Sequence, residues 1–306
     1  MFTMNRRTFL QTTAGLAGTA ALGCTATAQS ITPASSTVTI RKALKYSMID
    51  AEGLSMADKF RMVKDLGYDG IEMDSPNDFA TDEVLAARDA ADLPIHGVVD
   101  SVHWQQTLGD ADPAVRQAGI EGLMTALRDA RAYGASTVLL VPAVVGKAVS
   151  YQEAWDRSQV EIRKALPLAE ELGVQIAIEN VWNHFLLSPM EAARYIDAFE
   201  SPWIGWYFDS GNIVNYGWPE QWIRTLGPRI LKLDVKEFSR SKRNDLGLWK
   251  GFDVQIGDEA GDCDWPAVNQ ALADIGYSGW ATAEVRGGDR DRLAQILANM
   301  NRVFAS

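Results

Sequence analysis

Carboxylates stand at or near the ends of five segments that read as buried β-strands. They are Glu72 in GIEMD, Glu179 in VQIAIEN, Asp209 in IGWYFD, Asp234 in ILKLDVK and Glu284 in WATAEV. One acid at a strand end is usually a solvated charge, but five that converge would repel each other and resist ionisation. A divalent cation is the usual remedy, and oxygen ligands suit Mn²⁺ or Mg²⁺. The pattern therefore predicts a metal site.

The segments that carry these acids belong to a longer alternation of strand-like and helix-like stretches. The predicted strands are 44–49, 70–74, 95–100, 137–142, 174–180, 204–209, 230–236 and 280–285. Eight strands alternating with helices over roughly 260 residues is the count of an α/β (β/α)₈ TIM barrel. An open doubly wound sheet is the alternative, but no glycine-rich phosphate loop follows any predicted strand.

We accordingly expect a linker over residues 29–41 and a single TIM barrel domain over residues 42–306. In such a barrel the carboxyl ends of the strands line the mouth of the active site. The five acids would then meet on one rim.

The strand over 230–236 is unusual because its polar side carries Lys232, Asp234 and Lys236 together. We expect this side to face the lumen, with Asp234 among the metal ligands and the two lysines offsetting its charge. The simpler alternative is that one of the lysines pairs with Asp234, which leaves three ligands. A long connection over 239–262 follows, and we expect a lid, an oligomer contact or a solvated loop there.

The four acids Glu179, Asp209, Asp234 and Glu284, in this chain order, resemble the xylose isomerase-like superfamily of TIM barrels. The similar branch is the sugar phosphate isomerase/epimerase family, which includes ketose 3-epimerases and hydroxypyruvate isomerases. The resemblance covers the chain after its first 28 residues and is carried by GYDGIEMD, IAIEN, FDSGN and CDWPAVNQALADIGYSGWATAEV.

The resemblance implies metal ligands in the order Glu, Asp, His and Glu, with both glutamates also moving protons. Glu179, Asp209 and Glu284 match this order, whereas Asp234 stands where the family usually has histidine. Glu72 matches an acid at the substrate end, and Arg240 matches a substrate-contacting arginine.

Two more positions follow the family with changes. Lys236 matches a common lysine, and Asn212 replaces the histidine of an Asp-x-x-His motif.

The chemistry that this site implies is isomerisation or epimerisation next to a carbonyl. Two carboxylates on opposite faces of a sugar can exchange the roles of base and acid. The enediolate that forms needs an electrophile, which a metal on the carbonyl supplies. The sequence therefore predicts a metal-dependent sugar isomerase or epimerase.

Four further residues are candidates for sugar contacts. His103 and Trp104 follow the third strand, and Trp182 and His184 follow the fifth. Imidazoles can hydrogen-bond hydroxyl groups, and indole rings offer a broad apolar contact.

Three other functions are weighed against this one. Loss of a β-leaving group from the same enediolate would cleave a 3-keto-glycoside. A barrel that binds sugar without catalysis is a second alternative, since the usual histidine ligand is missing. The superfamily's DNA-repair endonucleases need many histidines and a basic surface, but this chain has three histidines and a net charge of −11. We therefore expect a small-molecule sugar as partner and no nucleic acid. The sequence leaves a homo-oligomer open.

The first 28 residues read as a twin-arginine signal peptide. Arg6 and Arg7 precede a weakly apolar stretch, and Ala26-Thr27-Ala28 offers a cleavage site. Removing this leader takes the net charge from −11 to −13, because it carries two arginines and no acid. We expect a soluble periplasmic protein without a transmembrane segment, and anchoring as a lipoprotein at Cys24 as the alternative. Export argues for an unphosphorylated keto-sugar, since sugar phosphates are kept in the cytoplasm.

Overall fold

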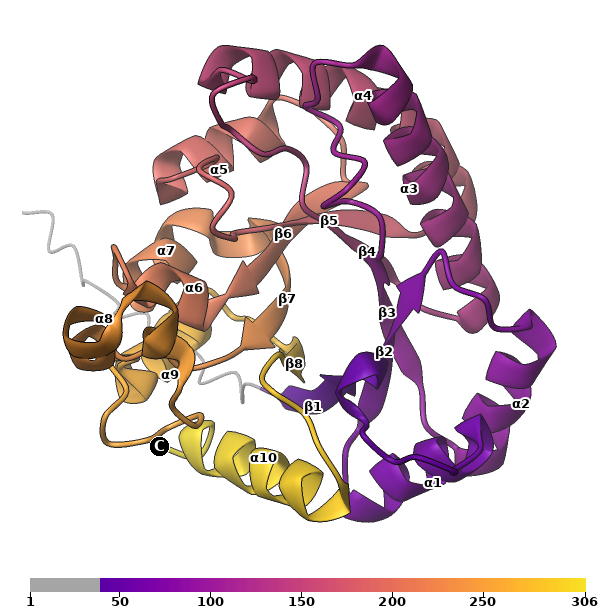
Figure 1. Cartoon of the computed structure of the whole chain (residues 1–306), viewed down its shortest axis with the longest axis vertical. Coiled ribbons are helices and arrows are strands. Elements are labelled where there is room, and N and C mark those ends of the chain that lie inside the picture. The colour runs from indigo at the N-terminus through magenta and orange to yellow at the C-terminus, as the bar shows by residue number, and fades with distance from the viewer. Residues whose placement is uncertain (1–38) are drawn as a thin grey trace, which may run out of the picture. The chain divides into compact units, whose positions relative to one another are not determined.

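Eight parallel strands close into a barrel in chain order, with β8 hydrogen-bonded to β1 (Figure 1). This computed structural model describes residues 39–306, and the predicted leader lies outside the described residues. The strands are β1 (Ile40–Lys45), β2 (Gly70–Ser75), β3 (Ile95–Asp100), β4 (Thr137–Leu140), β5 (Gln175–Glu179), β6 (Ile204–Asp209), β7 (Ile230–Val235) and β8 (Gly279–Ala283). The predicted (β/α)₈ TIM barrel is confirmed.

Helices surround the barrel and connect successive strands (Figure 1). They are α1 (Met56–Leu66), α2 (Thr81–Ala91), α3 (Pro113–Tyr133), α4 (Tyr151–Leu172), α5 (Pro189–Asp197), α6 (Ser210–Val214), α7 (Pro219–Leu226), α8 (Arg240–Leu246), α9 (Trp265–Asp274) and α10 (Arg290–Val303). Local sequence fixes several ends. Ser150 and Glu153 form a capping box at the start of α4, and Gly67 ends α1 with a φ of 98°. None of the helices in this described part combines the length and hydropathy that a membrane span requires.

Seven predicted strands agree with the structure to within two residues at each end, but the first was wrong. We predicted it over 44–49, whereas β1 spans Ile40–Lys45 and a short 3₁₀ turn, Tyr46–Met48, follows it. The Ile49 amide donates to the Tyr46 carbonyl at 3.1 Å and closes this turn. Tyr46, Met48 and Ile49 fit a strand pattern, and neither glycine nor proline marks the break.

The lumen below the carboxyl ends of the strands is filled by buried polar side chains. The Tyr207 hydroxyl donates to Glu72 Oε1 at 3.0 Å and lies 2.9 Å from Thr282 Oγ1, which in turn lies 3.1 Å from His96 Nε2. The packing is tight, because a Cβ at Gly97 would lie 2.6 Å from Glu72 Oε1. This network closes the lower part of the barrel, so a substrate has to enter from the carboxyl end.

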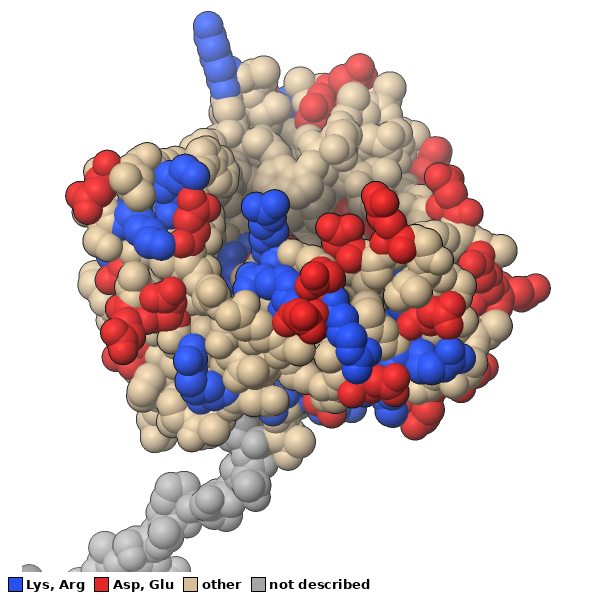
Figure 2. Space-filling model, turned by 60° about the horizontal axis from the view of Figure 1, so that its bottom comes forward, with Lys and Arg blue, Asp and Glu red and all other residues tan. Residues whose placement is uncertain are grey.

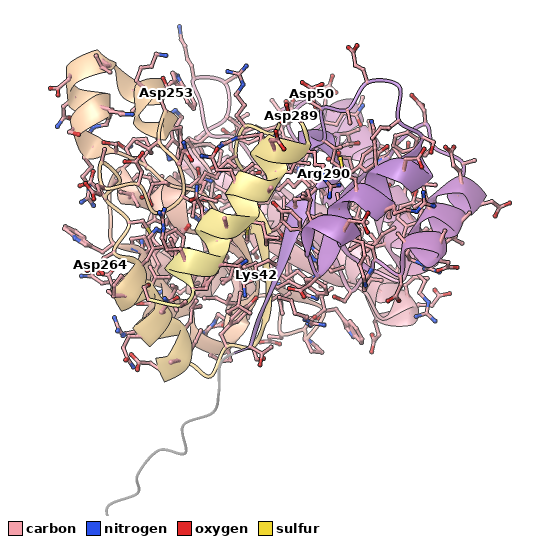
Figure 3. The ribbon with its side chains drawn as sticks, turned by 90° about the horizontal axis from the view of Figure 1, so that it is seen from below. Lys42, Asp50, Asp253, Asp264, Asp289 and Arg290 are labelled. Carbon is pink, nitrogen blue, oxygen red and sulfur yellow. The ribbon has the colours of Figure 1, made fainter. Side chains whose placement is uncertain are left out.

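The carboxyl end of the barrel is enlarged by the long connection between β7 and α9. This connection contains α8 and a 3₁₀ segment, Leu248–Phe252. Figure 3 shows Lys42 near the end where the described chain enters the barrel, and Asp50 and Asp253 at the opposite end. The face that bears Asp50 and Asp253 is therefore the mouth.

Candidate active site

Four carboxylates from four consecutive strands meet at the mouth of the barrel. Glu179 ends β5, Asp209 ends β6, Asp234 lies on β7, and Glu284 follows β8 directly. One oxygen of each lies within 4.8 Å of one oxygen of each of the others. Glu179, Asp209 and Asp234 are buried, while the Glu284 side chain is 30% exposed. The structure thus brings together all four predicted ligands.

Two lysines are wedged between these carboxylates. Lys45 Nζ donates to Glu284 Oε1 at 2.7 Å and to Asp234 Oδ2 at 2.9 Å. Lys236 Nζ lies 3.1 Å from Asp209 Oδ2 and also pairs with Glu284 Oε2. Both oxygens of Glu284 are therefore held by ammonium groups, which fixes the direction of its carboxylate.

The ion pairs and the burial of the site shift the pKa values of the carboxylates in opposite directions. Burial alone would raise the pKa of Glu284, but Lys236 and Lys45 outweigh it and hold that pKa well below its usual range. Burial, with Glu284 and Asp234 nearby, raises the pKa of Glu179. Burial also raises the pKa of Asp209 to about 7, against the opposing effect of Lys236. The two glutamates thus face different environments within one cluster.

The donor set fits a hard divalent cation. With all four carboxylates ionised, as metal binding requires, they and the two ammonium groups carry four negative and two positive charges, a net charge of −2, which one divalent ion neutralises. Asp234 Oδ1 is buried and accepts no hydrogen bond from the described residues. Oxygen donors alone favour an ion such as Mg²⁺ or Mn²⁺.

A second set of side chains holds the four carboxylates in place. Asp209 caps α6, because its Oδ1 accepts from the Asn212 amide at 2.6 Å. Asn180 Oδ1 accepts from the Asp209 amide at 3.0 Å, and Asn212 Nδ2 donates to the Asn180 carbonyl at 2.9 Å. Asn212 Nδ2 also lies 3.5 Å from Glu179 Oε1. Asn212 thereby links the carboxylates of Asp209 and Glu179.

A cavity of about 1320 Å³ opens above the cluster. Figure 2 shows the mouth as a hollow, with basic and acidic side chains side by side at its edge. The predicted substrate residues that line the cavity are His103, Trp104, Trp182, Asn212 and Lys236. The Val141 amide donates to His103 Nδ1 at 3.3 Å, so the proton of the neutral ring is on Nε2. Burial lowers the pKa of His103 to about 3, which keeps the ring neutral.

Three other predicted substrate residues lie away from the cavity. Glu72 is buried in the lumen network, and His184 is exposed on the loop after β5. The Arg240 guanidinium donates to the carbonyls of Val214 and Gly217, each at 2.8 Å, and therefore fixes a loop.

The lysines are also arranged differently from the expectation for β7. Lys232 points down the lumen, where its ammonium group donates to the His96 carbonyl. Asp234 pairs with neither Lys232 nor Lys236 but with Lys45. The predicted first strand, 44–49, puts Lys45 near its amino end, away from the mouth. In the structure Lys45 is the last residue of β1 and therefore lies at the mouth. The register of β1 with β8, in which Leu44 lies opposite Ala283, is what places Lys45 beside Glu284.

Comparison with known proteins gives one family. Residues 60–303 match the family model of the xylose isomerase-like TIM barrel. A curated relative, the L-ribulose-5-phosphate 3-epimerase UlaE of Escherichia coli O1:K1 / APEC, is 28% identical over 171 residues. That match covers 51% of this chain and 59% of the relative, so the chain spans somewhat over half the length of the curated relatives it matches.

Solved structures share the fold at low sequence identity. A D-psicose 3-epimerase crystallised in the presence of D-fructose has a TM-score of 0.70 at 19% identity, over 87% of this chain and 100% of that one. The 3-keto-D-glucoside 4-epimerase YcjR of E. coli has a TM-score of 0.69 at 16% identity, with the same coverage. The IOLI protein with a bound zinc atom has a TM-score of 0.68 at 16% identity, over 87% of this chain and 98% of that one.

Proposed function

Because the chain belongs to the xylose isomerase-like TIM barrel family, we propose that it is a metal-dependent sugar epimerase or isomerase. The observation that carries the proposal is the convergence of Glu179 and Glu284 with Asp209 and Asp234 within 4.8 Å. The epimerase named among its relatives supports the same reaction class.

Each residue of the site has a role in this proposal. Glu179 and Glu284 reach the substrate from β5 and β8, so that one removes the proton beside the carbonyl and the other returns a proton. Lys45 and Lys236 hold Glu284 by both of its oxygens. His103, with its proton on Nε2, donates to a substrate oxygen. A divalent cation held by the four carboxylates would supply the electrophile that stabilises an enediolate.

We further propose an unphosphorylated keto-sugar as the substrate and the periplasm as the place of action. Arg6 and Arg7 in the leader support export by the twin-arginine route. Replacing both by lysine in the full chain should retain the protein in the cytoplasmic fraction. Export that persists in this variant would argue against the route.

The reaction is tested by proton exchange in D₂O. We expect the protein loaded with Mn²⁺ to introduce deuterium beside the carbonyl of a ketose, together with epimer or isomer formation. Glu179→Gln and Glu284→Gln should each lower the rate by about 10²–10⁴-fold, because a proton-transfer group is lost. Glu170→Gln, an exposed change on α4, is the matched control and should behave as the wild type.

The other outcomes have distinct signatures. Release of the aglycone from a 3-keto-glucoside, with no epimer formed, would favour elimination at the same site. Sugar binding without exchange, in a protein that takes up no divalent metal, would favour a non-catalytic barrel. Turnover of ribulose 5-phosphate but not of ribulose would overturn the choice of an unphosphorylated substrate.

A further inference from the structure

The cavity above the carboxylates is larger than one sugar ring requires. Its volume of about 1320 Å³ exceeds the roughly 300–1,000 Å³ that is typical of pockets for drug-sized ligands. A single keto-sugar over the four carboxylates would therefore leave the outer part of the cavity open. The side chains that line this outer part indicate what fills it.

Three aromatic rings lead outward from the carboxylate cluster. The Phe252 ring centroid lies 5.6 Å from Lys236 Nζ, the ammonium group that pairs with Asp209 and Glu284. The Trp182 ring lies 5.0 Å from that of Phe252, and the Trp249 ring lies 5.1 Å from that of Trp182. All three side chains line the cavity. We call Phe252, Trp182 and Trp249 the aromatic wall.

The aromatic wall is held firmly although its outer end is open to solvent. The Trp182 indole donates to the Asn212 carbonyl at 2.9 Å, and the Ser239 amide donates to the Gly251 carbonyl at 2.7 Å. A Cβ at Gly251 would lie 2.2 Å from the Phe238 ring, so this backbone is seated directly on the barrel. Trp249 is nonetheless 68% exposed. Because its ring packs on Trp182, which packs on Phe252, the three rings form a contiguous apolar surface, and such surfaces mark binding sites.

A second exposed tryptophan lines the same cavity from the other side. Trp104 follows β3, is 47% exposed, and packs edge-on against His103. In a closed barrel of eight strands in chain order, β3 lies opposite β7, and the segment after β7 carries Trp249 and Phe252. Arg286 and Gln255 also line the cavity and offer hydrogen bonds to hydroxyl groups.

We propose that the aromatic wall is a subsite for a second ring, so that the natural substrate is a glycoside or disaccharide rather than a free monosaccharide. The reacting ring lies over the carboxylates, and the second ring stacks on Trp249 and Trp182. Flat, apolar ring faces suit indole, and the polar groups beside it take the hydroxyls. This inference rests on the proposed function for the identity of the reacting ring.

Binding of unreactive probes tests the subsite without turnover. Methyl α-glucoside and methyl β-glucoside carry one ring, and methyl β-cellobioside, methyl β-maltoside and phenyl β-glucoside carry two; none of them has a free carbonyl group. By calorimetry and tryptophan fluorescence, we expect at least one two-ring probe to bind about tenfold more tightly than the one-ring probes, because a second aromatic contact is made. Trp249→Ala should abolish this preference.

The matched control is Trp218→Ala. Trp218 is also exposed, at 55%, but it stacks on Arg240 outside the cavity. This variant should keep the preference for two rings. Equal binding of one-ring and two-ring probes by the wild type would overturn the inference. So would a Trp249→Ala variant that keeps the preference but changes the oligomeric state by light scattering, since the wall would then be a subunit contact. Failure of proton exchange with every ketose would count against the proposed function and leave the binding result standing.

Discussion

Lys45 is the residue on which the charge of the site depends most. Its ammonium group contacts Asp234 and Glu284 directly and lies 3.8 Å from Glu72. Burial alone would lower its pKa, but these carboxylates raise it above the ordinary value. Lys45 therefore stays charged and is a fixed cation beside the four carboxylates.

We predict that Lys45→Met destabilises the metal-free protein by about 3–5 kcal/mol, because it leaves buried carboxylates without a partner. Added Mn²⁺ should raise the midpoint of thermal unfolding more in this variant than in the wild type. Without the Lys45 ammonium group the carboxylate cluster is more negative by one charge and attracts the cation more strongly. Denaturant unfolding with and without Mn²⁺ measures both effects.

Lys64→Met is the control for that experiment, because Lys64 pairs with Asp92 at the surface, where their side chains are 42% and 96% exposed. Such pairs contribute about 1 kcal/mol or less. A Lys45 variant no less stable than this control would contradict the role of Lys45 in balancing the charge.

Asp100 gives the protein a pH-dependent stability. It ends β3, lines the cavity and is 1% exposed, and its Oδ1 accepts from the Val102 amide at 3.1 Å. Burial raises its pKa to about 7. A folded-state pKa above the unfolded one means that the folded state binds the proton more tightly, so stability is lost as the pH rises towards 7.

We predict that Asp100→Asn, which keeps the acceptor for Val102, removes this loss. The free energy of unfolding of the variant, relative to the wild type, should grow by about 3 kcal/mol between pH 5 and pH 8. Urea unfolding at the two pH values measures it. A difference between the two proteins that is the same at both pH values would contradict the assignment to Asp100.

At the scale of elements, one buried glutamate organises the connection between β7 and α9. Glu237 accepts hydrogen bonds from the Gly257 amide at 3.1 Å, the Cys263 amide at 2.9 Å and the Trp265 indole at 2.8 Å. Its two oxygens thus tie two points of the connection and the first residue of α9 to the end of β7. The aromatic wall belongs partly to this connection.

We predict that Glu237→Gln loosens this connection while the barrel stays folded. An amide nitrogen would face donors that need an acceptor, at a cost of about 1–3 kcal/mol. Hydrogen exchange over residues 239–262 should become faster, whereas exchange in β5 and β6 should not change. Glu170→Gln serves again as the control. Uniformly faster exchange would mean that Glu237 stabilises the whole barrel instead.

The sequence predicted most elements because each obeys a local rule, and it failed where contacts across the barrel decide. The positions of Glu179 and Asp209 at the ends of apolar runs predict their place at the mouth. The alternation of side chains between the two faces of a strand predicts that Asp234 lies on the inner side of β7. Lys45 was missed because nothing local separates the end of β1 from the turn after it. The prediction that Lys232 offsets the charge of Asp234 was wrong. The alternation of side chains along a strand tells which face a side chain is on, but not how deep in the lumen it lies.

At the scale of the whole molecule, a bound metal should stabilise the entire barrel, because its ligands come from four strands. At a metal concentration of 100 times its Kd, the expected gain is about 2.7 kcal/mol. For a domain of this size that is roughly 5 °C in Tm.

Calorimetry with EDTA and then with Mn²⁺ or Mg²⁺ measures this gain, and the larger shift identifies the preferred ion. Asp209→Asn combined with Glu179→Gln should remove the shift, while Glu170→Gln should keep it. A shift that survives the loss of both ligands would place the metal elsewhere.

The contact between Lys45 and Glu284 also sets an order in time. These residues are 239 positions apart in the chain, and they meet only when β8 pairs with β1. A ribosome has therefore made the chain as far as Glu284 before the site can exist, and a nascent chain that lacks β8 has open edges on β1 and β7. Such edges pair readily with other chains. Pairing of β8 with β1 and β7 thus brings Glu284 into the site and, in the same step, closes the open strand edges that could pair with other chains.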